Sequence, residues 1–288
     1  MGEAYRPLNL AEAIGIVKRQ DAVPLAGGTD LMVQHRSWSG LPPRFERPVV
    51  FISHLDELRD IKTDGDSVTI GASCTLTSIL QDERVPDLLR TAVHSIAGPS
   101  IRNRATIGGN ICNASPAADS LPALYVLGAE VVLMGEMGAR TISIEEFIEG
   151  PGKTCLQRGE LLTAVKLPAR NHDVTFFKKV GTRASSALAK LSLAAVARTE
   201  KGTVKEVRLA LGAVAPTVIR SAEAEKLMSG KTAEEIKGEL YRILNAYNKV
   251  LEPIDDQRST SVYRLKASFR LVLYFIGTVL LPDIEKSR

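Results

Sequence analysis

Two glycine pairs constrain this chain more than any other feature of its sequence. The first pair, Gly27-Gly28, directly follows the apolar run 23–26. The second pair, Gly108-Gly109, lies in the segment 106–119, which also holds two asparagines, two hydroxyl residues and one carboxylate. Glycine lets a backbone approach a neighbour closely and adopt positive φ. Both pairs therefore predict turns whose backbone lies against a ligand or against another segment.

The first pair has the pattern of an anion site. The peptide N–H groups around Gly27, Gly28 and Thr29 could form a concavity that binds a phosphate. A helix expected to begin at Leu31 would add its partial positive charge. The turn lacks the three spaced glycines of the dinucleotide-binding fingerprint. It is not a Walker loop either, because no Gly-Lys-Ser/Thr follows it. The alternative is a plain hairpin turn.

Asp30 is unusual beside a predicted anion. Two like charges about 4 Å apart repel each other by about 4 kcal/mol at an effective dielectric near 20. We therefore expect the Asp30 carboxylate to turn away and cap the helix, so that only its backbone N–H faces the anion.

The second pair stands among short polar side chains that can bond sugar hydroxyls and phosphate oxygens. A surface loop could carry the same residues for turn chemistry alone. Two glycine-rich anion sites in one chain indicate a ligand with a diphosphate in its middle.

The two motifs together resemble a known family, the FAD-binding subunits of the molybdenum hydroxylases. This family includes the medium subunits of xanthine dehydrogenase, aerobic carbon monoxide dehydrogenase and nicotinate dehydrogenase. The resemblance covers nearly the whole chain, and a bacterial xanthine-dehydrogenase type is the most similar. Its motifs, in chain order, are Ala26-Gly27-Gly28-Thr29-Asp30, Ser95-Ile96-Ala97-Gly98-Pro99-Ser100-Ile101-Arg102-Asn103, Thr106-Ile107-Gly108-Gly109-Asn110, Gly159-Glu160-Leu161-Leu162 and Phe177-Lys178-Lys179-Val180-Gly181-Thr182-Arg183.

The resemblance implies a noncovalent FAD site. Gly27 and Gly28 would hold the diphosphate, and Thr106 and Asn110 would bond phosphate and ribityl oxygens. Asp119 would accept hydrogen bonds from ribose hydroxyls, unless it merely caps a helix. The predicted cofactor-binding residues are Leu25, Ala26, Gly27, Gly28, Thr29, Asp30, Leu31, Ile96, Ala97, Thr106, Gly108, Gly109, Asn110, Ser115, Asp119, Leu161, Leu162 and Lys178.

The flavin ring needs an apolar slot with a few polar contacts. By motif position Ile96 and Leu161 or Leu162 would pack on the ring, although an ordinary core position is the alternative for all three. Lys178 would lie near the flavin edge, where a cation stabilises negative charge on the reduced ring. An exposed lysine at a strand end is the alternative for Lys178.

The resemblance also implies a function, that of an electron-transfer oxidoreductase subunit. A partner with two [2Fe–2S] clusters would deliver electrons from a molybdopterin-binding large subunit, and FAD would pass them to NAD or another acceptor. The chemistry would belong to the cofactor, so the sequence predicts no catalytic acid or base and no metal in this chain. The alternatives are a self-sufficient FAD-dependent oxidase or dehydrogenase and a scaffold that has lost its flavin.

Composition narrows the class of protein. The net charge of +4 over 288 residues gives no reason to expect a nucleic-acid partner. Cys74, Cys112 and Cys155 lie far apart, which excludes close metal-ligand spacing and is typical of a reducing compartment, so we expect a cytoplasmic protein. The longest apolar run, 271–281, is too short to cross a bilayer and predicts a buried C-terminal helix.

The predicted fold class is α+β. A FAD-binding domain at 1–170 would comprise α/β subdomains at about 1–54 and 55–170, and a domain at 171–288 would hold an antiparallel sheet with packed helices. Asn9 is expected to cap the first helix with Glu12 as reciprocal partner. Periodicity predicts helices at 10–18, from residue 76, and at 86–97, 122–127, 221–229, 232–250 and 262–281, and strands at 23–26, 48–52, 67–72, 130–134, 140–144, 160–167, 175–180, 191–198 and 204–214.

Overall fold

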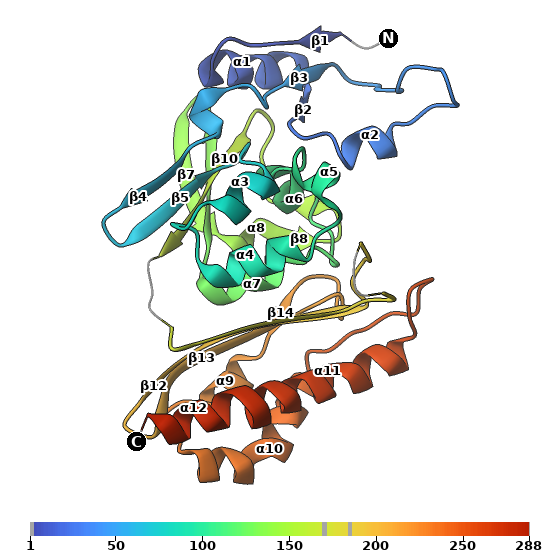
Figure 1. The fold of residues 1–288 in the computed structure, drawn as a ribbon. Coiled ribbons are helices and arrows are strands. Elements are labelled where there is room, and N and C mark those ends of the chain that lie inside the picture. Colours follow the sequence, from blue (N-terminus) through green and yellow to red (C-terminus); the bar gives the residue numbers. More distant parts are fainter. Residues whose placement is uncertain (1–2, 169–171, 184–185, 288) are drawn as a thin grey trace. The chain divides into compact units, whose positions relative to one another are not determined.

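The computed structural model describes residues 3–168, 172–183 and 186–287, which form two compact units (Figure 1). The first unit holds the chain up to Val85, Ala97–Ala114 and Ala129–Pro168. The second holds Pro86–Ile96, Ser115–Gly128 and the described residues after Pro168. The domain boundary predicted at 170 and 171 falls outside the described residues and stays a prediction.

The first unit begins with a small parallel sheet of strand order β1-β3-β2. Helix α1 packs its apolar stripe on this sheet, where Ile14 and Val17 join Val50 in one buried cluster. Fully burying an Ile or Val side chain contributes about 1.5–3 kcal/mol. The elements of this α/β part are β1 (Ala4–Tyr5), α1 (Leu10–Gln20), β2 (Val23–Leu25), α2 (Leu31–Gln34) and β3 (Val49–Phe51).

The start of α1 differs in one detail from the prediction. The Asn9 side chain accepts a hydrogen bond from the Glu12 backbone N–H at 2.9 Å, which confirms the cap. Glu12 does not complete a capping box, however, because its carboxylate accepts from the backbone N–H of Leu8 at 2.6 Å. The reciprocal bond therefore reaches one residue further out than expected.

The rest of the first unit is a five-stranded antiparallel sheet of order β4-β5-β10-β6-β7 with short helices. Strand β10 lies at its centre and pairs with β5 and β6. The elements are η1 (Asp56–Leu58), β4 (Ile61–Asp64), β5 (Ser67–Gly71), α3 (Leu76–Gln81), α5 (Pro99–Arg102), α6 (Ile107–Cys112), β6 (Glu130–Gly135), β7 (Gly138–Ser143), α8 (Ile144–Phe147), β8 (Ile148–Gly150), β9 (Lys153–Thr154) and β10 (Leu161–Pro168).

Two of these helices, α5 and α6, lie where periodicity predicts no regular element. Residues 98–110 contain α5 and most of α6, and Pro99 stands in the first turn of α5, where a missing N–H costs nothing. Left-handed alanines flank the segment, because Ala97 and Ala114 both have φ 45. Glycine pairs usually disfavour helix, so tertiary contacts described below override local propensity here.

The second unit is a four-stranded antiparallel sheet covered on both faces (Figure 1). Helices α4 and α7 contact one face, and α9, α11 and α12 contact the sheet from the other. Residues 191–197 of β12 are therefore buried on both faces. The elements are α4 (Asp87–His94), α7 (Ser120–Leu127), β11 (Val174–Val180), β12 (Leu191–Glu200), β13 (Thr203–Gly212), β14 (Ile219–Arg220), α9 (Ala222–Met228), α10 (Ala233–Asn248), α11 (Ser261–Phe275), η2 (Ile276–Leu280) and α12 (Leu281–Lys286). The predicted fold class is confirmed.

The C-terminal helix runs further than predicted. The sequence placed its end at 281, before Pro282, but α11 continues through the π-helical η2 into α12. Pro282 follows directly after the π-helical turn, so the regular α-helical bond pattern is already interrupted where proline supplies no N–H. Between Ser261 and Lys286 the helix is long and apolar enough to cross a bilayer. Its inner residues Val272, Phe275 and Ile276 are nevertheless buried in the core of the second unit, and core helices of this kind often meet the same length and composition criteria.

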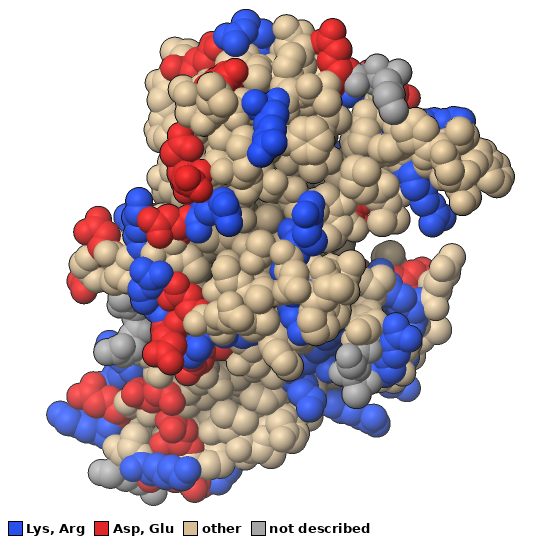
Figure 2. All heavy atoms as spheres, turned by 45° about the horizontal axis from the view of Figure 1, so that its top comes forward, with Lys and Arg blue, Asp and Glu red and all other residues tan. Residues whose placement is uncertain are grey.

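Surface charges are mixed. Figure 2 shows Lys and Arg beside Asp and Glu over much of the face that it draws. Lys249 and Glu223 form an ion pair in which both side chains are more than half exposed. Exposed pairs of this kind contribute about 0–1 kcal/mol each, so they do little to hold the fold.

One ion cluster is different because it is partly buried. Arg264 on α11 is 2% exposed, donates from Nη2 to Asp256 Oδ1 at 2.7 Å and from Nη1 to the carbonyl of Ile254 at 3.0 Å. Arg258 donates to the other oxygen of Asp256 at 2.7 Å. The bonds from Arg264 and then Arg258 hold the pKa of Asp256 well below its usual range. Asp256 thus ties the segment before α11 to the helix.

We predict that Asp256→Asn lowers the free energy of unfolding by about 3 kcal/mol at neutral pH, because the Arg264 guanidinium would stay buried without its counter-charge. A carboxyl with a lowered folded-state pKa stabilises the fold above its ordinary pKa of about 4, and this contribution shrinks as the pH falls below that value. Urea unfolding of both proteins between neutral and acidic pH measures the difference. Glu223→Gln is the exposed control and should change stability by less than about 0.5 kcal/mol. Equal losses in the two variants would contradict the assignment.

Candidate functional site

The first glycine pair turns the chain from β2 into α2 and leaves backbone donors free. Gly28 has φ 71, in the left-handed region that favours glycine. Successive N–H groups around one left-handed residue form a concavity that binds anions. Four successive N–H groups donate to no acceptor within the described part of the chain, those of Gly27, Gly28, Thr29 and Asp30.

The helix after this turn is shorter than the prediction required. Helix α2 has four residues, so its dipole is small. The prediction that Asp30 caps the helix is wrong, because Asp30 has helical backbone angles (φ −108, ψ −48) and its side chain makes no capping bond. Instead Asp30 Oδ2 accepts a hydrogen bond from Gln34 Nε2 at 2.6 Å.

The second glycine pair packs against protein and does not expose free N–H groups. Thr106 caps α6 by accepting from the N–H of Gly109 at 3.1 Å, and its carbonyl accepts from Asn110 at 3.0 Å. The N–H groups of Ile107 and Gly108 donate to the carbonyls of Cys74 and Ala72. All four N-terminal donors of α6 are therefore occupied, so a ligand at this motif would have to be bound by side chains, as predicted for Thr106 and Asn110. The Thr106 hydroxyl hydrogen remains available as a donor.

Close packing explains the glycines of both motifs. A Cβ on Gly108 would lie 2.7 Å from Ala72 Cβ. A Cβ on Gly27 would lie 2.0 Å from the Arg104 carbonyl oxygen. Real Cβ atoms essentially never lie this close to another heavy atom. The backbone before the second motif thus presses directly on the first motif, and the tertiary structure brings the two predicted motifs together.

Leu31 begins α2, and Ala97 lies just before α5 with positive φ, whereas three other predicted residues of the first unit lie at strand ends. Leu25 is 7% exposed at the end of β2. Leu161 and Leu162 begin β10 and are buried, and Leu161 belongs to the cluster under α1. For Leu161 this favours the core alternative that the sequence left open.

In the second unit Asp119 forms a buried ion pair with Lys179. Asp119 Oδ2 accepts from Lys179 Nζ at 2.6 Å, and the same ammonium donates to the Ser95 carbonyl at 3.0 Å. Asp119 is 5% exposed, and its Oδ1 has no hydrogen-bond partner in the described part of the chain. Burial raises the pKa of Asp119 to about 6, against the opposing effect of Lys179. A buried acceptor without a partner costs about 1–3 kcal/mol. A ligand that donated a hydrogen bond to Oδ1 would remove this cost.

The helix-cap alternative for Asp119 does not apply. Asp119 precedes α7, but its side chain makes no capping bond. Ser115, four residues earlier, accepts from the N–H of Ala117 at 3.3 Å. Ile96 is half-buried directly after α4.

The structure pairs Lys179, the neighbour of the predicted Lys178, with the carboxylate of Asp119. Lys178 is exposed, whereas the Lys179 side chain is 12% exposed. Neighbouring residues of a strand face opposite sides of the sheet, so a shift of one residue changes the environment completely. Phe176 and Phe177 are consecutive, so β11 has an apolar residue on each face. Alternation of apolar and polar residues therefore cannot predict which of the two lysines faces the protein interior.

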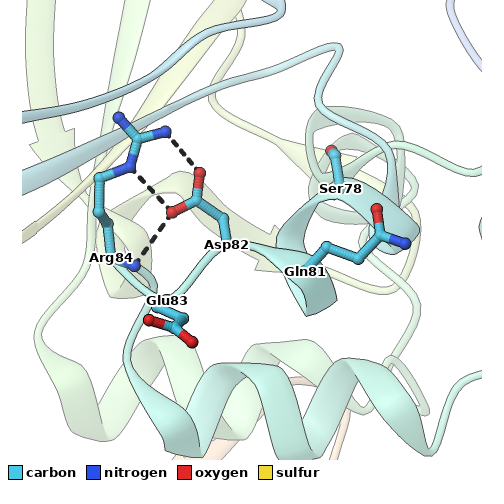
Figure 3. A pocket seen from close by; sticks show the side chains of 5 residues that line it. All are labelled: Ser78, Gln81, Asp82, Glu83 and Arg84. Carbon is cyan, nitrogen blue, oxygen red and sulfur yellow. Dashed lines mark hydrogen bonds and ion pairs between the residues drawn. The ribbon is translucent and has the colours of Figure 1, made fainter.

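One shallow surface hollow lies elsewhere in the first unit (Figure 3). Its lining is polar, and Arg84 forms a two-pronged ion pair with Asp82, with Nε 2.9 Å from Oδ1 and Nη2 2.5 Å from Oδ2. It has no apolar wall for a ring system. The lining residues are Ser78, Gln81, Asp82, Glu83 and Arg84, none of which the sequence analysis selected.

Comparisons with known proteins show the family to which the chain belongs. Residues 1–170 match the family model of the FAD binding domain in molybdopterin dehydrogenase. Residues 176–279 match that of the CO dehydrogenase flavoprotein C-terminal domain. Together these two matches account for most of the chain.

Individual relatives match over nearly their full length. The putative xanthine dehydrogenase FAD-binding subunit of Escherichia coli is 34% identical, over 93% of this chain and 90% of the relative. The carbon monoxide dehydrogenase medium chain of Hydrogenophaga pseudoflava is 31% identical over 94% of both chains. A solved structure of carbon monoxide dehydrogenase from the same organism superposes with a TM-score of 0.85 at 29% identity, over 94% of each chain. The chain therefore belongs to the FAD-binding medium subunits of the molybdenum hydroxylases, the flavoprotein components of oxidoreductases.

Proposed function

We propose that this chain binds one noncovalent FAD whose diphosphate lies against the backbone of residues 27–30. The observation that carries the proposal is the row of four N–H groups without acceptors in the described part of the chain, in a turn with one left-handed glycine. Such a turn binds a phosphate through neutral donors, and the carboxylate of the same turn, that of Asp30, is engaged by Gln34. The hydroxyl of Thr106 and the side chain of Asn110 are proposed as further donors to the phosphate and ribityl oxygens.

Asp119, which the sequence predicts as a cofactor-binding residue, stays proposed as a polar contact of FAD, together with its ion-pair partner Lys179. The Oδ1 atom of Asp119 would accept from a hydroxyl or N–H group of FAD, as its lack of a partner among the described residues supports. Lys179 replaces Lys178 in the role near the flavin edge, because Lys179 is held in place by Asp119 and Ser95. An ordered cation tunes the flavin potential more effectively than a solvated one.

The proposed role is electron transfer within a multi-subunit, cytoplasmic molybdenum hydroxylase. FAD would supply the redox chemistry, accepting electrons from a [2Fe–2S] subunit and passing them to NAD or another external acceptor. The substrate would be oxidised at a molybdopterin-binding large subunit. The residues of this chain bind and orient the cofactor and hold charge beside it.

Cofactor content tests the proposal. We expect the purified chain to show the visible bands of oxidised flavin and to release about one FAD per chain on heating, with no covalent remainder. Coexpressed large and iron–sulfur subunits are expected to copurify with it. A self-sufficient oxidase would instead turn over substrate without these partners, and a chain that takes up no FAD would overturn the proposal.

Neighbouring lysines provide a second, internally controlled prediction. Lys179→Met should weaken FAD binding about tenfold, because it removes one charge-assisted contact and leaves Asp119 without its ion pair. Lys178→Met changes the adjacent exposed residue and should alter the affinity by less than about twofold. Flavin fluorescence titration of the two flavin-free variants makes the comparison. The opposite order of effects would restore Lys178 to the role that the sequence assigned to it.

Titration of Asp119 gives a third prediction. Because the pKa of Asp119 is raised to about 6, its carboxylate is largely protonated below that pH and is then a poorer acceptor. The affinity for FAD should therefore fall as the pH drops through about 6. Asp119→Asn should bind FAD more weakly at neutral pH and should lose this pH dependence. A wild-type affinity that stays constant between pH 5 and pH 8 would contradict the role.

A further inference from the structure

The side-chain amide of Gln34 joins the two glycine motifs. Its Nε2 atom donates to Asp30 Oδ2 at 2.6 Å and to Asn113 Oδ1 at 3.3 Å. Asp30 stands before α2, and Asn113 is the C-terminal cap of α6. One NH₂ group has two hydrogens, so both bonds can form at the same time.

This bridge lies at the opposite end of the first motif from the glycine contact. At Gly27 the motif is pressed against Arg104 and Ala105, which precede α6. At Gln34 it is bonded to Asn113, which follows α6. The segment 27–34 is therefore attached before and after α6, and it contains the four N–H groups that have no acceptor among the described residues.

The bridge also controls the charge beside these donors. The carboxylate of Asp30 belongs to the same turn as the free N–H groups and would repel a phosphate. Its bond to Gln34 holds one carboxylate oxygen toward α2. A glutamate side chain at position 34 would add a second negative charge at this point, and an apolar residue would leave Asp30 free to turn toward the anion.

We propose that Gln34 is a positioning residue for the diphosphate, which acts by fixing the first motif to α6 and by restraining Asp30. This inference rests on the proposed FAD function. Gln34 itself need not touch the cofactor. All three side chains of the bridge reach solvent, so we expect a modest effect on affinity and a specific effect on the part of the ligand that carries phosphate.

The test compares Gln34→Met, Gln34→Glu and a double variant that combines Asp30→Asn with Gln34→Glu in the flavin-free full chain. Gln34→Met keeps the length of the side chain and removes both donors, and should weaken FAD binding about fivefold. Gln34→Glu should weaken it further. In the double variant the amide introduced at position 30 can donate to the carboxylate introduced at position 34, and the net charge equals that of the wild type. Its FAD affinity should therefore return to within about twofold of the wild-type value.

Two further measurements separate positioning from general destabilisation. Riboflavin lacks phosphate, so its affinity should be the same in Gln34→Met and in the wild type. Hydrogen exchange should show FAD protecting the amides of residues 27–30 in the wild type and protecting them less in Gln34→Met. The matched control is Gln81→Met, which changes an exposed glutamine of α3 in the same unit (Figure 3) and should leave all three quantities unchanged.

Each outcome decides the question. An FAD affinity in Gln34→Met within about twofold of the wild type, an equal loss for FAD and riboflavin, or a double variant as weak as Gln34→Glu would overturn the positioning role. A wild-type chain that binds no FAD would overturn the proposed function itself, and this result is recognised before any variant is made.

Discussion

The close contact between the backbones of the two motifs is the point on which the candidate site depends. The backbone at Gly27 lies so near the Arg104 carbonyl that a Cβ atom would be 2.0 Å away. No side-chain rearrangement can relieve a clash with backbone, so only glycine is compatible with this approach. The contact fixes where the first turn lies relative to α6, and the free N–H groups of residues 27–30 take their position from it.

The two glycine pairs look alike in sequence and have different roles. At the first pair the backbone donors stay free, whereas at the second pair every N-terminal donor of α6 is used by the cap or by the neighbouring carbonyls of Cys74 and Ala72. Glycine is required for space at the second pair, since Gly108 packs on Ala72. Close packing thus requires glycine at both Gly27 and Gly108, and the two pairs differ in whether their backbone donors have acceptors among the described residues.

The ion pair of Asp119 and Lys179 leaves one buried oxygen atom, Asp119 Oδ1, unsatisfied among the described residues. Burial opposes the ionised carboxylate and raises the pKa of Asp119, while Oδ1 is left without a partner among the described residues. Proteins rarely keep a buried acceptor unsatisfied. The cost is offset only if a ligand supplies the donor, which is consistent with a flavoprotein subunit whose fold and family are established by its relatives.

The sequence by itself determined the family, the first glycine turn and most of the regular elements. These depend on local features: glycine pairs, apolar periodicity and caps such as Asn9, which the structure confirms. Only the tertiary structure decided that α6 is a helix with occupied donors, that Asp30 bonds Gln34, and that Lys179 faces Asp119. Most of these arrangements depend on a partner distant in sequence, such as Ala72, Asn113 or Ser95. Local pattern cannot place such partners, because a shift of one strand residue reverses the face that a side chain occupies.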